Sequence, residues 1–150
     1  MASITSTLNN LIETSKDGEQ GFRTSAENAQ NAELKQLFMR RADDCARGAA
    51  ELQAIVARLG KEPEDSGSVA GAIHRGWVNL KAAVANRDDL AILEECERGE
   101  DVAKAAYRSA LEKTDLPAEI RTVVQKQYDG VLRNHDEVRN LRDRFKATAH

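Results

Sequence analysis

Apolar residues recur at spacings of three and four along nearly the whole chain, which is the period of an α-helix. The longest segments with this period lie at about residues 3–30, 32–59, 89–113 and 114–146. No segment has the alternation of apolar and polar residues that favours a strand. Aromatic residues make up only 4% of the chain and charged residues 31%, which is typical of helices packed through Ala, Leu and Val. We therefore predict an all-α fold.

The lengths of the connections select among helical bundles. A short turn near residue 31 joins the first two long helices and another near Asp115 joins the last two, so each pair should form an antiparallel hairpin. The connection between the pairs, about residues 61–87, contains a further predicted helix at 69–85. That helix would span roughly 25 Å, enough to run along the bundle. We predict a ferritin-like four-helix bundle of two hairpins with a helical crossover, formed by residues 1–150 as a single domain.

Charge and composition argue against several partners and locations. The net charge of −3 disfavours nucleic acid or an anionic membrane as the main partner. The N-terminus lacks the pattern of a signal peptide, and no window approaches the roughly 18 apolar residues of a membrane span, so we expect a cytoplasmic protein. Cys45 and Cys96 lie on apolar helical faces and are expected to be buried thiols, with a disulfide or metal ligation as alternatives. These features leave open a homo-oligomer and a protein partner that the sequence does not identify.

A glycine followed by a glutamate occurs twice inside helical segments, at a constant offset of 81 residues. The two copies are Gly18-Glu19 and Gly99-Glu100. Because an interior helical glycine costs roughly 1 kcal/mol relative to alanine, the repetition needs a physical reason. It also supports a bundle built from two related hairpins.

Counting residues from the hairpin turns places several glycines near mid-bundle. One explanation is close helix contact, in which the ring of Phe22, Tyr107 or Tyr128 fits against a bare backbone. The other is that the glycines make room for a buried polar site or permit a π-bulge. The five glycines are Gly18, Gly21, Gly48, Gly99 and Gly130.

Acidic residues and a histidine fall at the same height, and carboxylate and imidazole groups are ligands for iron, manganese or zinc. A di-iron or di-manganese bundle takes a Glu from each of two helices and a Glu-x-x-His from each of the other two. The sequence contains no Glu-x-x-His. The alternatives are a catalytic dinuclear centre, a weak or single-metal site, and a metal-free salt-bridge network, of which we expect the last, with no cofactor and no enzymatic activity. The candidate metal ligands are Glu19, Asp44, Glu97, Glu100 and His135.

A guanidinium stands where the pattern requires a histidine. Asp44-x-x-Arg47 replaces one Glu-x-x-His and Leu132-x-x-His135 the other. The sequence therefore predicts that Arg47 neutralises mid-bundle carboxylates by bidentate pairing.

A second polar cluster lies in the crossover, in the segment HRGW. Trp77 can serve as an anchor that lays the crossover on the bundle. Alternatively, His74, Arg75 and Trp77 form an exposed patch for a protein partner or an anionic ligand.

The segments DGEQGF, EPEDSGSVAGAIHRGWVNLK and ILEECERGED resemble an uncharacterised family of bacterial four-helix-bundle proteins, labelled domain of unknown function 2383, within the ferritin-like superfamily. The resemblance extends from about residue 8 to residue 141. It implies a soluble ferritin-like bundle and supplies no activity, while the superfamily's metal ligands carry over only to Glu19, Glu100 and His135. We thus expect a non-enzymatic bundle with a buried Glu/His/Arg cluster; the alternatives are a metal-binding protein and a stress-associated protein-interaction module.

Overall fold

The structure is a computed structural model that describes residues 4–63, 77, 79–113 and 115–148. These residues contain five α-helices and no strand, so the predicted all-α fold is confirmed. The four long helices begin and end within a few residues of the predicted bounds. The helices are α1 (Ile4–Asn28), α2 (Ala32–Arg58), α4 (Leu80–Ala85), α5 (Asp89–Leu111) and α6 (Ala118–Thr148).

Local signals in the sequence account for the helix ends. The side chain of Asn31 accepts a hydrogen bond from the Leu34 N–H and so caps α2, and Asp88 caps α5 in the same way. Gly60 follows α2 with a φ of +75°, a conformation that L side chains rarely adopt. Turns therefore form where the sequence predicts them.

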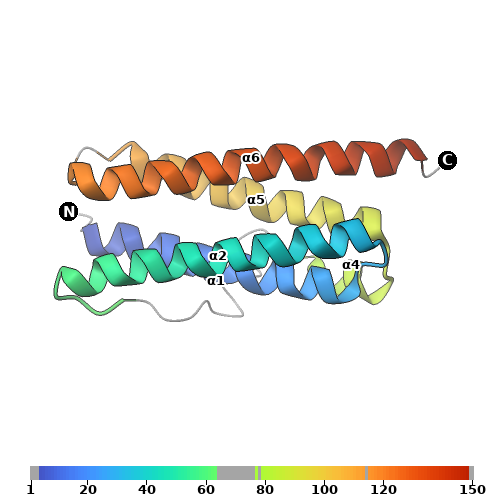
Figure 1. Cartoon of the computed structure of the whole chain (residues 1–150), viewed down its shortest axis with the longest axis horizontal. Helices are drawn as coiled ribbons and strands as arrows, with labels where there is room; N and C mark the ends of the chain where they lie inside the picture. The colour runs from blue at the N-terminus through green and yellow to red at the C-terminus, as the bar shows by residue number, and fades with distance from the viewer. Residues whose placement is uncertain (1–3, 64–76, 78, 114, 149–150) are drawn as a thin grey trace.

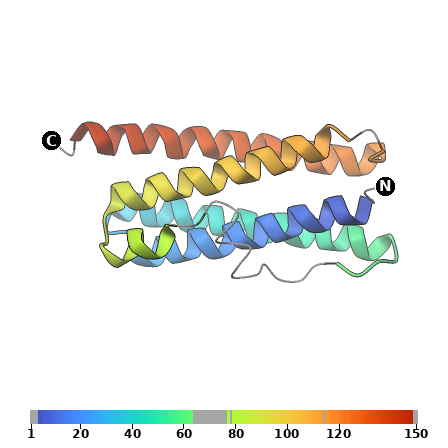
Figure 2. The same cartoon turned by 180° about the vertical axis from the view of Figure 1, so that it is seen from behind.

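The long helices form two antiparallel hairpins, α1 with α2 and α5 with α6, as predicted (Figure 1). The connection between the hairpins crosses the length of the bundle, because α2 ends at one end and α5 begins at the other. Seen from behind, α5 passes between α6 and the first hairpin (Figure 2). The backbone of α1 lies close to α2 and α5, whereas the backbones of α2 and α6 approach each other at few points. Helices α2 and α5 therefore occupy one diagonal of the bundle.

The crossover differs from the prediction of one helix over residues 69–85. Residues 69–76 and 78 lie outside the described residues, Trp77 and Asn79 are not helical, and α4 begins only at Leu80. The backbone N–H of Asn79 donates to the carboxylate of Glu95 on α5, and the Trp77 side chain is buried. The prediction of an unbroken helix here is wrong because these contacts with the bundle replace helical hydrogen bonds.

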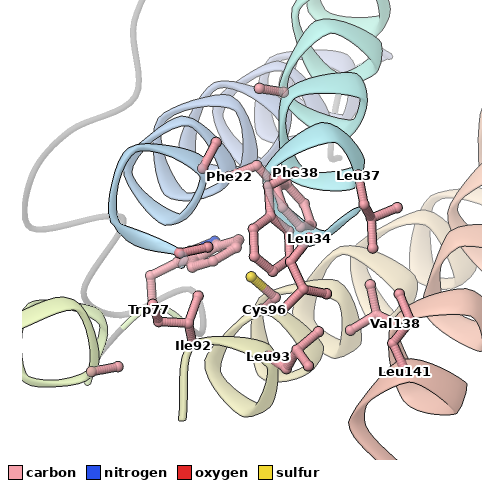
Figure 3. Packing of buried hydrophobic residues seen from close by; sticks show 14 residues of the cluster. Phe22, Leu34, Leu37, Phe38, Trp77, Ile92, Leu93, Cys96, Val138 and Leu141 are labelled. Atoms are coloured by element: carbon pink, nitrogen blue, oxygen red, sulfur yellow. The ribbon is translucent and has the colours of Figure 1, made fainter. Parts of the chain in front are cut away.

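Two separate clusters of buried hydrophobic side chains form the core. The first includes Phe22, Phe38, Trp77 and Leu93 and lies at the α4 end (Figure 3). The second, toward the other end, includes Leu11, Leu52, Tyr107 and Ile120. A polar layer in mid-bundle separates the two clusters. None of the helices described by the structure is both long enough and apolar enough to cross a membrane.

Candidate functional site

Two of the mid-bundle glycines let the indole ring of Trp77 pack against helix backbone. A Cβ atom on Gly99 would lie 2.4 Å from the indole, and one on Gly21 would lie 2.6 Å from it. The ring therefore occupies the junction of α1 and α5. It also packs edge-to-face with Phe22, and the centroids of the two rings lie 5.2 Å apart (Figure 3). Close contact was one of the two explanations offered for the glycines, but the aromatic partner is Trp77. None of the described residues is π-helical.

A buried ion pair crosses the diagonal of the bundle beside this ring. The Arg41 guanidinium on α2 donates through Nε and Nη2 to the two carboxylate oxygens of Glu100 on α5, at 3.1 and 3.3 Å. The two side chains are 6% and 1% exposed. Arg41 also donates through Nη1 to Asp44, at 3.3 Å, and lies 5.3 Å from the ring centroid of Phe22. A single guanidinium thus joins two helices that lie across the diagonal of the bundle from each other.

Burial and charge act in opposite directions on this pair. Desolvation raises the pKa of the Glu100 carboxyl, and Arg41, the largest opposing influence, lowers it without cancelling the rise. For Arg41, burial lowers the pKa, but the attraction and hydrogen bonds of Glu100 together with the other neighbouring groups, including Asp44, raise it by more, so the guanidinium stays charged. Burial also raises the pKa of the neighbouring Cys45 thiol to about 12. The centre of the bundle therefore contains a guanidinium, Arg41, that stays charged. The charged form of the buried Glu100 carboxylate is stabilised mainly by that guanidinium.

A chain of hydrogen bonds links the four long helices on the other side of the polar layer. The Tyr107 hydroxyl donates to Gln127 Oε1 at 2.6 Å and lies 3.4 Å from Ser15 Oγ. Gln127 Nε2 in turn donates to the carbonyl oxygen of Gly48 and to Glu51, at 3.3 and 2.7 Å. Burial raises the pKa of Tyr107 to about 12. This chain satisfies polar groups that the second core cluster would otherwise bury unpaired.

A cavity of about 250 Å³ lies between the ion pair and this hydrogen-bonded chain. Each of the four long helices contributes a glycine to its wall: Gly18, Gly48, Gly99 and Gly130. Phe22, Trp77 and Val131 form apolar parts of the wall. Gly48 and Gly130, where a Cβ would make only ordinary contact, thus make room, which was the second explanation offered for the glycines.

The cavity opens between α2 and α6. The lining residues on α1 are all buried, whereas Arg133 on α6 is exposed and Asp44 and Asn134 are half-buried. This distribution agrees with the few points at which the backbones of α2 and α6 approach each other. A small molecule therefore has a path from solvent to the centre of the bundle.

The five candidate metal ligands form separate contacts with other residues. Glu19 pairs with Arg23 on its own helix at 3.1 Å, and Glu97 accepts a hydrogen bond from Arg142 on α6. His135 Nε2 lies 2.6 Å from Asp101. Within the part of the chain that the structure describes, only Asp44 and Glu100 of the five share a partner, and that partner is Arg41.

A dinuclear metal centre does not fit this arrangement, because both oxygens of Glu100 receive hydrogen bonds from a guanidinium. No group of three or more His, Cys, Asp or Glu side chains among the described residues is arranged to hold a metal ion. The predicted role of Arg47 is wrong: its side chain is 73% exposed and pairs with Asp44. Arg41, one turn and a half earlier, is the buried guanidinium.

The three candidate partner-binding residues of the crossover have different outcomes in the structure. Trp77 is buried and acts as the anchor, which was one of the two alternatives. His74 and Arg75 lie outside the described residues. A partner-binding patch that includes the Trp77 ring at the surface does not match this burial.

Sequence reasoning missed Arg41, Gln127 and Arg133 as site residues. Arg41 and Gln127 each stand on an otherwise apolar helical stripe, and that is the signal by which both could have been found. Arg133 has no such signal, because its position at the cavity opening depends on how α2 and α6 separate.

Residues 3–113 match the sequence model of the family described as Domain of unknown function (DUF2383). The match covers more than half of the chain, so the chain belongs to this family. The matched residues end before α6, which contributes Gln127, Gly130 and Arg133 to the cavity. No curated protein matches the sequence.

Proposed function

We propose that this protein is a non-enzymatic, ferritin-like bundle that binds a small molecule in its central cavity. The Arg41–Glu100 pair takes the central position where metal-bearing bundles hold cations. The observation that supports the proposal is the cavity itself, with one glycine from each long helix in its wall. Glycines that leave a helix face bare cost stability, and a cavity costs more, so both features favour a role for the space.

The volume defines the size of the ligand. A dry cavity of roughly 150 Å³ admits benzene, so one of about 250 Å³ admits a molecule of roughly ten non-hydrogen atoms. Apolar walls from Phe22, Trp77 and Val131 favour an apolar body, and the polar groups at the two ends favour one or two hydrogen bonds.

The ionisable groups beside the cavity support binding rather than catalysis. A general base or nucleophile works best with a pKa near the working pH. The thiol of Cys45 and the hydroxyl of Tyr107 both have pKa values of about 12, and the Glu100 carboxylate is held by Arg41. These groups shape and polarise the cavity without supplying a reactive atom near neutral pH.

The test uses phenylacetamide, a neutral molecule of the right size, as probe. Trp77 is the single tryptophan of the chain and lines the cavity, so its fluorescence reports occupancy. We expect a saturable change in wild type and its loss in Gly130→Leu, whose side chain would fill the space. Gly130→Ala is the matched control and should still bind the probe. Equal responses in wild type and Gly130→Leu would refute the proposed site.

Thermal melting with added Mn²⁺, Fe²⁺ or Zn²⁺ tests the absence of a metal function. We expect no stabilisation of the wild type by any of these ions. Stabilisation that disappears in both Glu100→Gln and His135→Ala would instead assign a metal site with unusual ligands.

A further inference from the structure

One cation at the cavity opening has no partner among the residues that the structure describes. Arg41 pairs with Glu100, and Asp44 accepts hydrogen bonds from both Arg41 and Arg47. The Arg133 guanidinium forms no ion pair or hydrogen bond with any residue that the structure describes. Both carboxylates of the cavity wall, Glu100 and Asp44, thus already receive hydrogen bonds from Arg41, which leaves the Arg133 guanidinium for a ligand to neutralise.

Arg133 lies where a bound molecule would emerge. Its Nη2 atom is 3.7 Å from the position that a Cβ on Gly130 would occupy, so the guanidinium extends over the bare helix face at the opening. A planar guanidinium there can donate two parallel hydrogen bonds to a carboxylate. The inner walls, formed by Phe22 and Trp77, are aromatic and suit an apolar group.

These observations, taken with the small-molecule function proposed above on which they rest, define a ligand class. We propose that the cavity binds a small organic monoanion: an apolar body of roughly ten non-hydrogen atoms that carries one carboxylate. The body lies against Phe22 and Trp77, and the carboxylate pairs with Arg133 at the opening. Inorganic anions lack the apolar body and leave the inner walls unfilled.

The experiment compares phenylacetate with the neutral phenylacetamide, both followed by Trp77 fluorescence and by calorimetry. Because a hydrogen bond to a charged group contributes about 1.5 kcal/mol or more, we expect phenylacetate to bind roughly tenfold more tightly to the wild type. Arg133→Gln should weaken phenylacetate binding much more than phenylacetamide binding, so that the preference falls to within about twofold. Arg139→Gln is the matched control, because Arg139 lies on the same helix, pairs with Asp136 and is not in the cavity wall.

The outcomes separate the two proposals. Equal binding of both probes to the wild type, abolished by Gly130→Leu, would overturn the carboxylate inference and leave the proposed function standing. Binding of neither probe would overturn both. A preference for phenylacetate that survives Arg133→Gln, or orthophosphate binding as tightly as phenylacetate, would also overturn the inference.

Discussion

The two sides of the polar layer use glycine for opposite purposes. On the α1/α5 side, the bare backbones of Gly21 and Gly99 are covered by the Trp77 indole, and no Cβ atom fits there. On the α2/α6 side, a Cβ on Gly48 would lie 3.6 Å from Gln127 and one on Gly130 would lie 3.7 Å from Arg133, which is ordinary contact. A helical glycine can therefore mark either tight packing or reserved space, and the neighbouring elements decide which.

The two copies of the Gly-Glu pair also have different surroundings. Glu100 reaches across the bundle to Arg41, whereas Glu19 at the equivalent position pairs with Arg23 on its own helix. Gly99 faces the indole, but a Cβ on Gly18 would meet the Cys45 sulfur at 3.0 Å. Equivalent sequence positions thus lie in different environments, because Trp77 packs on Gly99 and Cys45 packs on Gly18.

Removing the Trp77 indole, which covers the glycines on the α1/α5 side, should cause the largest loss of stability. Trp77→Ala deletes a buried ring, and we expect the free energy of unfolding to fall by about 3–5 kcal/mol. Urea denaturation followed by circular dichroism measures the loss. Trp77→Phe, which keeps an aromatic ring, should lose less. A loss below about 1 kcal/mol for Trp77→Ala would contradict the anchor role.

The ion pair lies at the boundary of the two sides. Arg41→Met leaves Glu100 buried without its cation, and we expect destabilisation of about 3 kcal/mol at neutral pH. Replacing both residues, as Arg41→Met with Glu100→Leu, should recover much of that loss because no uncompensated charge remains. Urea melts of the single and double variants test this, and equal losses would argue against coupling.

The loss in Arg41→Met should also depend on pH. Burial already raises the pKa of Glu100 in the folded state above its ordinary value of 4.5, and removal of Arg41 removes the main influence that lowers it. A carboxyl with a raised folded pKa binds its proton more tightly when folded, so its contribution to stability is present at low pH and is lost as pH rises through the folded pKa. The variant should therefore be closer to wild type at pH 5 than at pH 8; a deficit that shrinks as pH rises would contradict this.

The glycine comparison itself can be tested by matched substitutions. Gly99→Ala forces a Cβ into the indole, and we expect a net loss of about 2 kcal/mol despite the better helix propensity of alanine. In a Trp77→Ala background the same substitution should be neutral or stabilising, because the obstructing ring is absent. A double-mutant cycle with additive effects would show that Trp77 is not the cause.

The smallest effects on stability are expected on the α2/α6 side, where the cavity opens. Gly48→Ala and Gly130→Ala should each stabilise the protein by up to about 1 kcal/mol, since the Cβ fits and the helix gains propensity. Thermal melting of both variants beside Gly99→Ala gives the comparison directly. Destabilisation by either one would mean that the space near α2 and α6 is smaller than the structure indicates.

Helix positions could be predicted from the sequence because they depend on local physics. The period of apolar residues, the caps Asn31 and Asp88, and Gly60 after α2 are all signals within a few residues of the feature they determine. The hairpin topology also follows, because turn length limits which helices can be neighbours. The presence of an acidic and glycine-rich middle was visible for the same reason.

Pairing across the bundle was decided only by the tertiary structure. Whether Arg41 or Arg47 reaches the buried Glu100 depends on the rotation of α2, which shifts a side chain from the core to the surface within two residues. The break of the crossover at Trp77 depends on a gap between α1 and α5, and the cavity depends on the separation of α2 from α6. The sequence by itself therefore determined the helices and their order, while contacts between distant segments determined which polar groups meet and where space remains.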